Sequence, residues 1–300
     1  MRAILEKNIE LYDHETIVRE NGMRLIGFGR YAGIVGAYNG FRAIGLKNQT
    51  FNLPKAENLD NQQDLIAELN KIKVPNFKIL LTGNGKVAYG AKEMLDAMNV
   101  KRVSINEYIN NTFSEPVYYL ADVLDYNKRK DRKIKNNKDF YKHPENYESD
   151  FMRFAAVTDF FIAGHFYGNG APYLFTRENA KSKEFNIKFV ADISCDVDGP
   201  VASTIKASTI ADPIYGYHPE TASEVDFKDD KAIVVMAVDN LPCELPKDAS
   251  EGFGEMFLEN VIPAFFNNDK DGVLQRAKMT ENGKLTERFS YLQDYIDGKE

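Results

Sequence analysis

The segment KILLTGNGKVAYGAKEML, residues 78–95, decides the fold of this 300-residue chain. Residues 78–81 form an apolar run typical of a buried strand, and a helical pattern follows the next turn and continues to Met98. Gly83, Gly85 and Ala88 give the pattern G-x-G-x-x-A between them. In such a turn the first glycine permits a tight bend, the second lets the backbone approach a pyrophosphate, and the third, small residue allows close packing. The segment therefore predicts a dinucleotide-binding turn at a helix N-terminus.

Outward from this segment, strand-like and helical patterns alternate along the chain. This order is typical of the α/β class, and it predicts a Rossmann-like, doubly wound and mostly parallel sheet. Small residues recur at three- and four-residue spacing over residues 31–47, which predicts a closely packed helix. Further strands are predicted at residues 9–12, 24–28, 102–105, 117–120, 160–163, 188–193 and 232–238, and further helices at residues 3–7, 62–73, 249–266 and 285–296.

The composition excludes several classes of protein. With 43% hydrophobic and 28% charged residues, the chain is globular in character and not disordered or fibrous. A formal net charge of -7 argues against nucleic-acid binding, because like charges repel. The two cysteines and four histidines have no metal-ligand spacing, so we expect no metal site and a reducing compartment. No apolar run approaches the roughly 18 residues that span a bilayer, so we expect a cytoplasmic protein without a membrane partner.

The residue that binds the adenine-side ribose decides between the two nicotinamide cofactors. An acidic residue about 20 residues beyond the glycines commonly binds the ribose hydroxyls of NAD. Here the predicted strand 102–105 runs into Asn106 and Glu107 at that point. Glu107 supplies a carboxylate one residue late, whereas the neutral Asn106 does not repel the 2′-phosphate of NADP. We therefore expect NAD, with NADP not excluded.

The segment DISCDVDGP, residues 192–200, places three carboxylates after a predicted strand. Ligands bind at the carboxyl ends of strands in open parallel sheets, so Asp192 and Asp196 are candidates for substrate binding. A helix cap or a calcium-like loop is the alternative.

Two other segments carry polar or charged groups. In VDNLPCELP, residues 238–246, Asp239 and Asn240 are candidates for contact with a nicotinamide or its ribose, with turn formation as the alternative. The most basic stretch, KRKDRKIKNNK at residues 128–138, predicts a solvated loop, with attraction of a phosphate or an acidic substrate as the alternative.

Several of these segments together resemble one family. Residues 24–43, 82–90, 192–200 and 237–256 are similar to the alanine dehydrogenase and lysine-forming saccharopine dehydrogenase superfamily, and in particular to its lysine-ketoglutarate reductase type of domain. The resemblance extends to RENAKSKEF, residues 177–185, and to STIADPIYGYHPE, residues 208–220, so it spans nearly the whole chain. The glycine turn is generic, whereas residues 24–43 and 238–246 are much more specific.

The resemblance implies a two-domain enzyme that moves a hydride between a nicotinamide ring and the C–N bond of an amino acid or imine. It implies a remnant of an N-terminal substrate domain at residues 1–28, a nucleotide-binding domain at residues 29–240, and C-terminal helices at residues 241–300 that return to a second α/β domain formed by the chain ends. By position it assigns the pyrophosphate to Tyr89 and Gly90, the ribose to Asn106, the nicotinamide side to Val238, Asp239, Asn240 and Leu241, and an amino-acid substrate to Arg24 and Phe28.

Two departures from the family pattern concern catalysis. The family's proton-transfer lysine and histidine lie in an N-terminal stretch that has no match here, so no catalytic residue is assigned, and we expect this chain by itself to bind cofactor but to turn over very slowly. His165 stands where an apolar residue is usual, and it is either a substitute acid or a core histidine. The alternative functions are alanine dehydrogenase and a nucleotide-binding module without chemistry. A homodimer through the glycine-rich helix is also expected.

Overall fold

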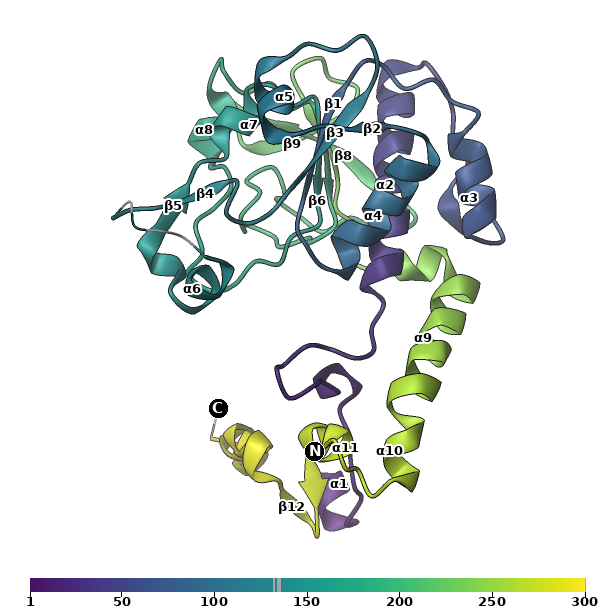
Figure 1. Ribbon diagram of the computed structural model, residues 1–300, viewed down its shortest axis with the longest axis vertical. Helices are drawn as coiled ribbons and strands as arrows, with labels where there is room; N and C mark the ends of the chain where they lie inside the picture. The colour runs from purple at the N-terminus through teal and green to yellow at the C-terminus, as the bar shows by residue number, and fades with distance from the viewer. Residues whose placement is uncertain (132, 134–135, 300) are drawn as a thin grey trace. The chain divides into compact units, whose positions relative to one another are not determined.

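The computed structural model describes residues 1–131, 133 and 136–299, and the described chain forms two compact units (Figure 1). The larger unit comprises Gly29–Asp248. The smaller unit combines both ends of the chain, Met1–Phe28 and Ala249–Glu300. Among the helices of the described chain, none is both long and apolar enough to cross a bilayer.

The larger unit is built on an eight-stranded sheet in the order β2-β3-β1-β6-β7-β10-β8-β9. The first six strands in this order run parallel, β8 runs antiparallel to its neighbour β10, and β9 runs antiparallel to β8. The predicted Rossmann-like, mostly parallel sheet is therefore confirmed. The strands are β1 (Lys78–Thr82), β2 (Lys101–Arg102), β3 (Val117–Ala121), β6 (Phe160–Ala163), β7 (Phe189–Asp192), β8 (Ile214–His218), β9 (Ser223–Val225) and β10 (Ile233–Met236).

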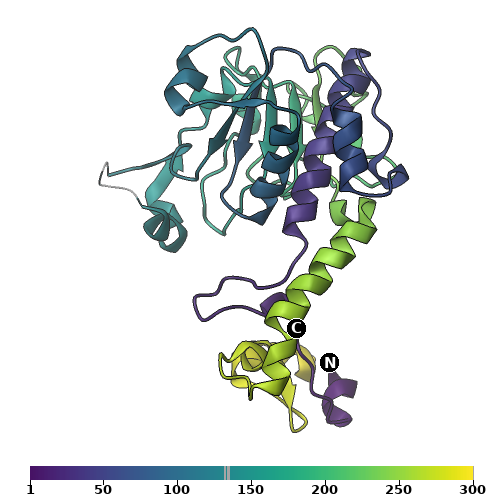
Figure 2. The same cartoon turned by 45° about the vertical axis from the view of Figure 1, so that its right-hand side comes forward.

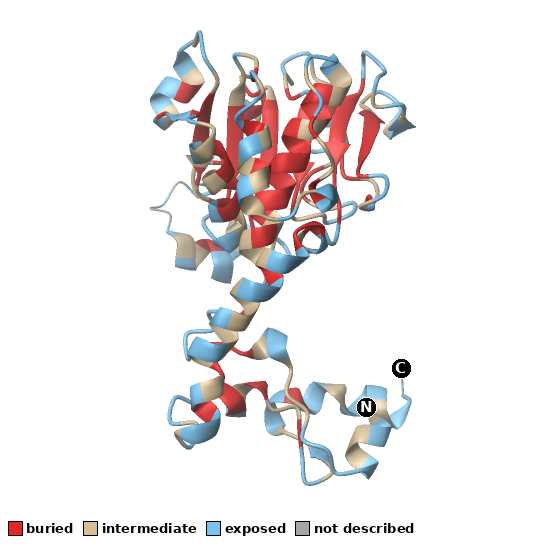
Figure 3. Cartoon of the chain, turned by 90° about the vertical axis from the view of Figure 1, so that its right-hand side faces the viewer, coloured by how far each residue is buried: buried red, intermediate tan, exposed pale blue. Residues whose placement is uncertain are grey.

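Apolar side chains cover both faces of this sheet, because its central strands are buried along their whole length (Figure 3). On one face, Leu80, Phe161 and Val190 pack with residues of α5 (Ile105–Asn110), α7 (Met152–Ala155) and α8 (Arg177–Lys181). On the other face, α2 (Gly29–Asn48) packs on β7 and β10, and α4 (Lys86–Ala97) packs on β1. Figure 2 shows α2 and α4 side by side.

The β2 region differs from the sequence-based prediction. The strand predicted at residues 102–105 is present only as the shorter β2, which ends at Arg102, and α5 begins at Ile105. Ser104 and Glu107 form a capping box at the start of α5, in which each side chain bonds the backbone N–H of the other residue. In addition, β2 pairs with β3 and not with β1. The direct parallel neighbours of β1 are therefore β3 on one side and β6 on the other.

Other differences are smaller. The antiparallel strands β8 and β9 were not predicted, nor was the hairpin of β4 (Asn127–Arg129) and β5 (Tyr147–Ser149). The helix predicted at residues 62–73 is the shorter α3 (Gln62–Leu69). The basic stretch 128–138 overlaps β4 and the first residues of α6 (Asn137–Lys142), and its residues 132, 134 and 135 lie outside the described residues.

The smaller unit has a small core of its own. Ile17, Ile26, Val261 and Leu274 are among its buried residues. The strands predicted at residues 9–12 and 24–28 are wrong, since only isolated bridges form there. The helix predicted at residues 249–266 is divided into two, and the helix predicted at residues 285–296 is mostly the 3₁₀ helix Glu287–Leu292. The elements of this unit are α1 (Arg2–Glu6), α9 (Pro246–Asn260, which begins in the larger unit), α10 (Ile262–Phe266), α11 (Val273–Ala277), β11 (Thr280–Glu281), β12 (Lys284–Leu285) and α12 (Gln293–Asp297).

Candidate functional site

The turn between β1 and α4 uses its three small residues in three different ways. Gly83 has a positive φ of 113°, and a Cβ atom there would lie 2.4 Å from the carbonyl oxygen of Gly164. Gly85 has an extended backbone, and a Cβ atom there would meet no atom within 4 Å. Ala88 is buried, and its Cα atom lies 3.2 Å from where a Cβ of Gly164 would be. Gly83 and Ala88 therefore permit close packing, and Gly85 leaves space open above the turn.

Gly90 has a structural role that differs from its predicted one. A Cβ atom at Gly90 would lie 1.9 Å from the carbonyl oxygen of Arg30 in α2, and one at Gly33 would lie 2.0 Å from the carbonyl oxygen of Val87 in α4. The two glycines thus allow the backbones of α2 and α4 to approach each other, as predicted for the glycine-rich helix. The predicted pyrophosphate contact at Gly90 finds no support here, because this glycine faces a helix. The glycine-rich face on which the predicted homodimer was based is likewise buried within the chain.

The open turn lies at a switch point of the sheet. From β1, the following strand β3 lies on one side and β6 lies on the other, so the connections leave in opposite directions, and such crevices are where open α/β sheets bind nucleotides. A cavity of about 450 Å³ occurs here, which we name the turn cavity. It is lined by residues 83–87, by Asp122, Val123 and Tyr126 after β3, by Asn137 and Tyr141 of α6, and by residues 164–166 after β6.

The acidic residue beside the glycine turn is Asp122 and not Glu107. Asp122 directly follows β3, and the N–H of Gly83 donates to the carbonyl oxygen of the preceding Ala121 at 3.0 Å. The Asp122 carboxylate accepts hydrogen bonds from the side-chain amide of Asn137, at 3.2 and 3.0 Å. By contrast, the carboxylate of Glu107 is engaged at the start of α5, where Ser104 N donates to it at 2.8 Å and Ser104 Oγ at 2.6 Å.

The residues predicted to contact the ribose do not line the turn cavity, and their ribose contact stays a prediction. Asn106 and Glu107 lie in the first turn of α5, which follows a strand that is not the neighbour of β1. Asp122 directly follows β3, the strand that is that neighbour, and it lines the turn cavity. The signal in the sequence was the apolar run Val117–Ala121 followed directly by an aspartate.

The loop after β7 is closed by Asp192. This carboxylate is completely buried, and it accepts hydrogen bonds from Ser194 Oγ at 2.5 Å, Thr204 Oγ1 at 2.6 Å and the N–H of Cys195 at 3.1 Å. Burial raises the pKa of Asp192, and these three hydrogen bonds oppose that rise. The geometry gives Asp192 a structural role within its own loop, although no helix of the described chain begins there for it to cap. The substrate contact predicted for Asp192 stays a prediction.

The other acidic residues of this loop are exposed. Asp196 is exposed, so it stays a candidate for ligand contact. Asp198 is paired with Arg177 at 2.8 Å.

His165 is a buried histidine in the wall of the turn cavity. The residue is 7% exposed, its ring contacts Tyr126 edge to face, and its Nδ1 lies 2.9 Å from Thr82 Oγ1. Burial lowers the pKa of His165 to about 4. The ring is therefore neutral near pH 7, which does not suit the role of a substitute acid.

Comparisons with known proteins find relatives of this chain. Alpha-aminoadipic semialdehyde synthase from Mus musculus is 27% identical over 346 residues, an alignment that covers 99% of this chain and 37% of that protein. The enzyme of the same name from Arabidopsis thaliana is 25% identical, with 96% of this chain and 31% of that protein covered. Saccharopine dehydrogenase [NAD(+), L-lysine-forming] from Yarrowia lipolytica is 22% identical, with 85% and 62% covered. No family model matches the chain.

The fold agrees with these relatives. A solved L-alanine dehydrogenase superposes with a TM-score of 0.55 at 15% identity, covering 99% of this chain and 71% of that chain. The resemblance of this chain to the alanine dehydrogenase and saccharopine dehydrogenase superfamily is thereby confirmed. It spans about a third of the length of the semialdehyde synthases.

The positions assigned by resemblance to this superfamily have different environments. Tyr89 is 50% exposed, and its hydroxyl donates to Asn84 Oδ1 in the glycine turn at 3.1 Å. Val238 and Leu241 are buried, whereas Asp239 and Asn240 between them are exposed after β10. The exposed pair is therefore free of the core and stays a candidate for contact with the nicotinamide side.

The two residues assigned to substrate binding lie in the smaller unit. Phe28 stacks on Phe253 with ring centroids 4.7 Å apart, and the guanidinium of Arg24 lies 3.6 Å from the Glu15 carboxylate. Both side chains are partly exposed, at 38% for Phe28 as a whole and 49% for the Arg24 side chain. Their substrate contacts stay predictions.

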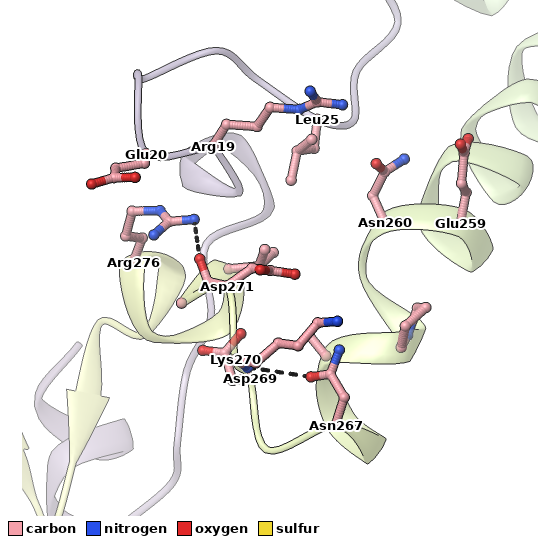
Figure 4. Close-up of a pocket in the computed structure, with 14 residues that line it drawn as sticks. Arg19, Glu20, Leu25, Glu259, Asn260, Asn267, Asp269, Lys270, Asp271 and Arg276 are labelled. Carbon is pink, nitrogen blue, oxygen red and sulfur yellow. Dashed lines mark hydrogen bonds between the residues drawn. The ribbon is translucent and has the colours of Figure 1, made fainter.

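A second cavity, of about 750 Å³, lies within the smaller unit (Figure 4). Its wall mixes both signs of charge, with Arg19, Lys270 and Arg276 beside acidic residues. Arg276 donates to the carbonyl oxygen of Asp271 at 2.8 Å, and Asp269 accepts from two N–H groups at the start of α11. Charged groups of this wall thus bond to neighbouring groups of the same unit. The cavity has no part in the function proposed below.

Proposed function

We propose that this chain binds NAD at its glycine turn and serves an amino-acid dehydrogenase that transfers a hydride at a C–N bond. The observation that carries the proposal is Gly85, where the absence of a side chain leaves open space above the turn at the switch point of the sheet. No packing in the described chain explains a glycine with ordinary extended backbone at that place. A ligand whose phosphates approach the backbone explains it.

The residues around the turn fit a dinucleotide. The helix α4 begins after Gly85 without a side-chain cap, so its N-terminus favours a negative group. Val87 and Tyr126 supply apolar and aromatic surface in the turn cavity, which is the character of most cofactor sites. When bound, a nicotinamide ring supplies the site that accepts or delivers the hydride. The chain's own part is to hold the dinucleotide at Gly85 and to place its ribose.

Asp122 supports NAD as the cofactor. A carboxylate at the end of the strand beside β1 accepts hydrogen bonds from the ribose hydroxyls of NAD. The same charge repels the 2′-phosphate of NADP, particularly in a partly enclosed cavity. Asn137, which now donates to Asp122, would give way to the ribose hydroxyls.

The substrate proposed is saccharopine, or lysine with 2-oxoglutarate. The names of the relatives support this choice, since the semialdehyde synthases cover nearly the whole chain and a saccharopine dehydrogenase covers 85% of it. Alanine dehydrogenase is the second candidate, because a protein of that name shares the fold. A substrate screen that follows the absorbance of the reduced nicotinamide separates the two. The cytoplasmic location and the homodimer stay predictions.

A glycine variant tests the cofactor proposal. Gly85→Val fills the open space with a side chain that the extended backbone accepts, so the fold is kept. We expect the affinity for NAD⁺ to fall by at least about 100-fold, which corresponds to roughly 2.7 kcal/mol. Calorimetric titration measures the affinity, and a thermal melt confirms the fold.

Gly254→Val in α9 is the matched control, because a Cβ atom there also meets nothing within 4 Å. This variant should bind NAD⁺ as the unmodified chain does. Equal NAD⁺ affinity of the two variants contradicts the proposed site.

A further inference from the structure

His165 lies across the switch point from the glycine turn. It comes two residues after β6, and the ends of β1 and β6 are in register, with Thr82 opposite Ala163. The two strand ends touch, since a Cβ atom at Gly83 would lie 3.0 Å from the Cα atom of His165. The histidine therefore stands at the level where a dinucleotide held by Gly85 crosses the sheet.

The contact with Thr82 determines which nitrogen of the ring carries the proton. In the described chain, the bonding partner of the buried Thr82 hydroxyl is Nδ1 of His165, at 2.9 Å. If the hydroxyl donates to Nδ1, the proton of the ring is on Nε2. If Nδ1–H donates instead, two groups lack a partner: the hydroxyl proton of Thr82 has no acceptor, and Nε2 has no donor. The first arrangement leaves fewer buried groups unpaired, so the ring carries its proton on Nε2.

The Nε2–H group then lacks an acceptor. Nε2 is buried and makes no hydrogen bond to any described part of the chain. A buried donor without a partner is costly, and nearly all such groups in folded proteins are paired with protein, water or ligand. The ring is neutral, since burial lowers the pKa of His165 to about 4. It therefore offers a directional N–H donor and not a positive charge.

We propose that Nε2–H of His165 donates a hydrogen bond to an oxygen of the bound dinucleotide, at the pyrophosphate or the ribose next to the nicotinamide. The proposal rests on the proposed function, because it needs a dinucleotide at Gly85. His165 lines the turn cavity together with Gly83 and Gly85, so an oxygen of a ligand in that cavity can supply the acceptor that the described chain does not. His165 is thus a binding residue that the glycine motif does not mark, and Thr82 is the positioning residue that fixes its tautomer.

Binding of three ligands to one variant tests this proposal. His165→Phe keeps an aromatic ring against Tyr126 and removes both nitrogens. We expect its affinity for NAD⁺ and for ADP-ribose to fall about tenfold in calorimetric titrations. Affinity for AMP, which has neither the pyrophosphate nor the second ribose, should stay within about twofold. Unchanged NAD⁺ affinity overturns the proposal, and so does an equal loss for AMP, which would mean that the cavity has collapsed.

Two controls distinguish a specific role of His165 from other causes of weak binding. His14→Phe replaces a histidine of the smaller unit that also packs on an aromatic ring, and it should bind all three ligands normally. If the unmodified chain itself binds no NAD⁺, the proposed function has failed. If it binds and His165→Phe binds equally well, only the role of His165 has failed.

Nitrogen-15 NMR of the unmodified chain decides the matter even where a variant is poorly folded. The ring should show a protonated Nε2 and a bare Nδ1, and the Nε2–H resonance should move when NAD⁺ is added. In Thr82→Val, which removes the hydroxyl, the ring should show a mixture of tautomers. A ring protonated on Nδ1 in the unmodified chain, or an Nε2–H that does not respond to NAD⁺, overturns the proposal.

Discussion

The glycine turn after β1 and the aspartate loop after β7 both follow buried parallel strands at the same edge of one sheet. They differ in what their polar groups do. Asp192 is buried and bonded to three groups of its own loop, whereas Gly85 opens space and Nε2 of His165 lacks a partner in the described chain. Of the two, the turn is the one that fits the cofactor site proposed above.

The comparison teaches that residue type and strand-end position do not by themselves mark a binding site. By sequence, the aspartate loop is the richer in chemistry, with three carboxylates within seven residues, 192–198. In the structure, the first of them holds the loop together. The glycine turn and the loop after β6 carry fewer reactive side chains, yet they leave unmet hydrogen-bonding capacity beside a cavity.

The largest expected effect is a loss of stability when the hydrogen bonds of the aspartate loop are removed. Asp192→Ala removes an acceptor from Ser194, Thr204 and the N–H of Cys195, and it should cost about 3 kcal/mol of unfolding free energy. In a unit of this size the melting temperature should fall by roughly 6 to 12 °C. A thermal melt followed by circular dichroism measures it, and NAD⁺ affinity of the remaining folded protein should change little.

Asp196→Ala is the matched control, because this carboxylate is exposed in the same loop. Its melting temperature should stay within about 1 °C of the unmodified chain. If Asp192→Ala is equally harmless, the aspartate loop does not have the structural role that the comparison assigns to it.

The second effect is a difference in stability between variants of the two glycines in the turn, Gly83 and Gly85. Gly83→Ala forces a side chain into a positive-φ position and against the carbonyl oxygen of Gly164, so it should destabilise the chain by about 2 kcal/mol or more. Gly85→Ala should leave stability within about 0.5 kcal/mol, because its backbone is extended and its surroundings are open. Chemical denaturation of both variants measures the difference, and equal stabilities refute the division of roles.

The third effect concerns cofactor choice at the open turn. Asp122→Ser removes the carboxylate that follows β3, and we expect NAD⁺ affinity to fall about tenfold, or 1.4 kcal/mol, while NADP⁺ affinity falls less or rises. Competitive titration of the two cofactors measures the ratio. Asp230→Ser replaces an exposed aspartate and serves as the control. If the ratio of NAD⁺ to NADP⁺ affinity is unchanged in Asp122→Ser, a group other than Asp122 discriminates between the two cofactors.

How much of this could be predicted from sequence depends on the kind of signal. The runs at residues 117–120 and 160–163 are continuous apolar segments, and both are strands in the structure. The strand predicted at residues 102–105 is too long because its last residues overlap the capping pattern Ser104-x-x-Glu107, which favours a helix start. The strand prediction led to residues 106 and 107 as candidates for ribose contact, whereas the carboxylate that lines the turn cavity is that of Asp122.

Other features depend on contacts between distant residues and leave no local pattern. The roles of Gly85 and Gly90 cannot be separated by spacing, since only the approach of α2 shows that Gly90 faces a helix. His165 was singled out by its position, but its partner Thr82 is 83 residues away in the sequence. The bonds that occupy Asp192 likewise include Thr204, which no motif connects to it.

The smallest expected effect concerns the loop after β10. Like the glycine turn it has exposed polar residues, and like the aspartate loop it has a buried carboxyl group. Asp239 and Asn240 are exposed like the glycine turn, whereas Glu244 is 2% exposed and accepts from Asn39 Nδ2 at 2.8 Å. Burial raises the pKa of Glu244 from 4.5 to about 7, although the bond from Asn39 opposes the rise. Glu244 is thus a buried carboxyl group with less compensation than Asp192 receives.

The raised pKa sets the direction of the pH dependence. The folded state holds the Glu244 proton more tightly than the unfolded chain does, so the group stabilises the fold below pH 4.5, and this contribution is lost as the pH rises through 7. Glu244→Gln keeps an acceptor for Asn39 and cannot ionise, so at pH 8 it should be more stable than the unmodified chain by about 1 kcal/mol, with little difference at pH 4.5. Denaturation curves at both pH values measure this, with the exposed Glu184→Gln as the control. A stability difference that is the same at both pH values would mean that Glu244 titrates as an ordinary surface glutamate, and that this loop is as open as the glycine turn.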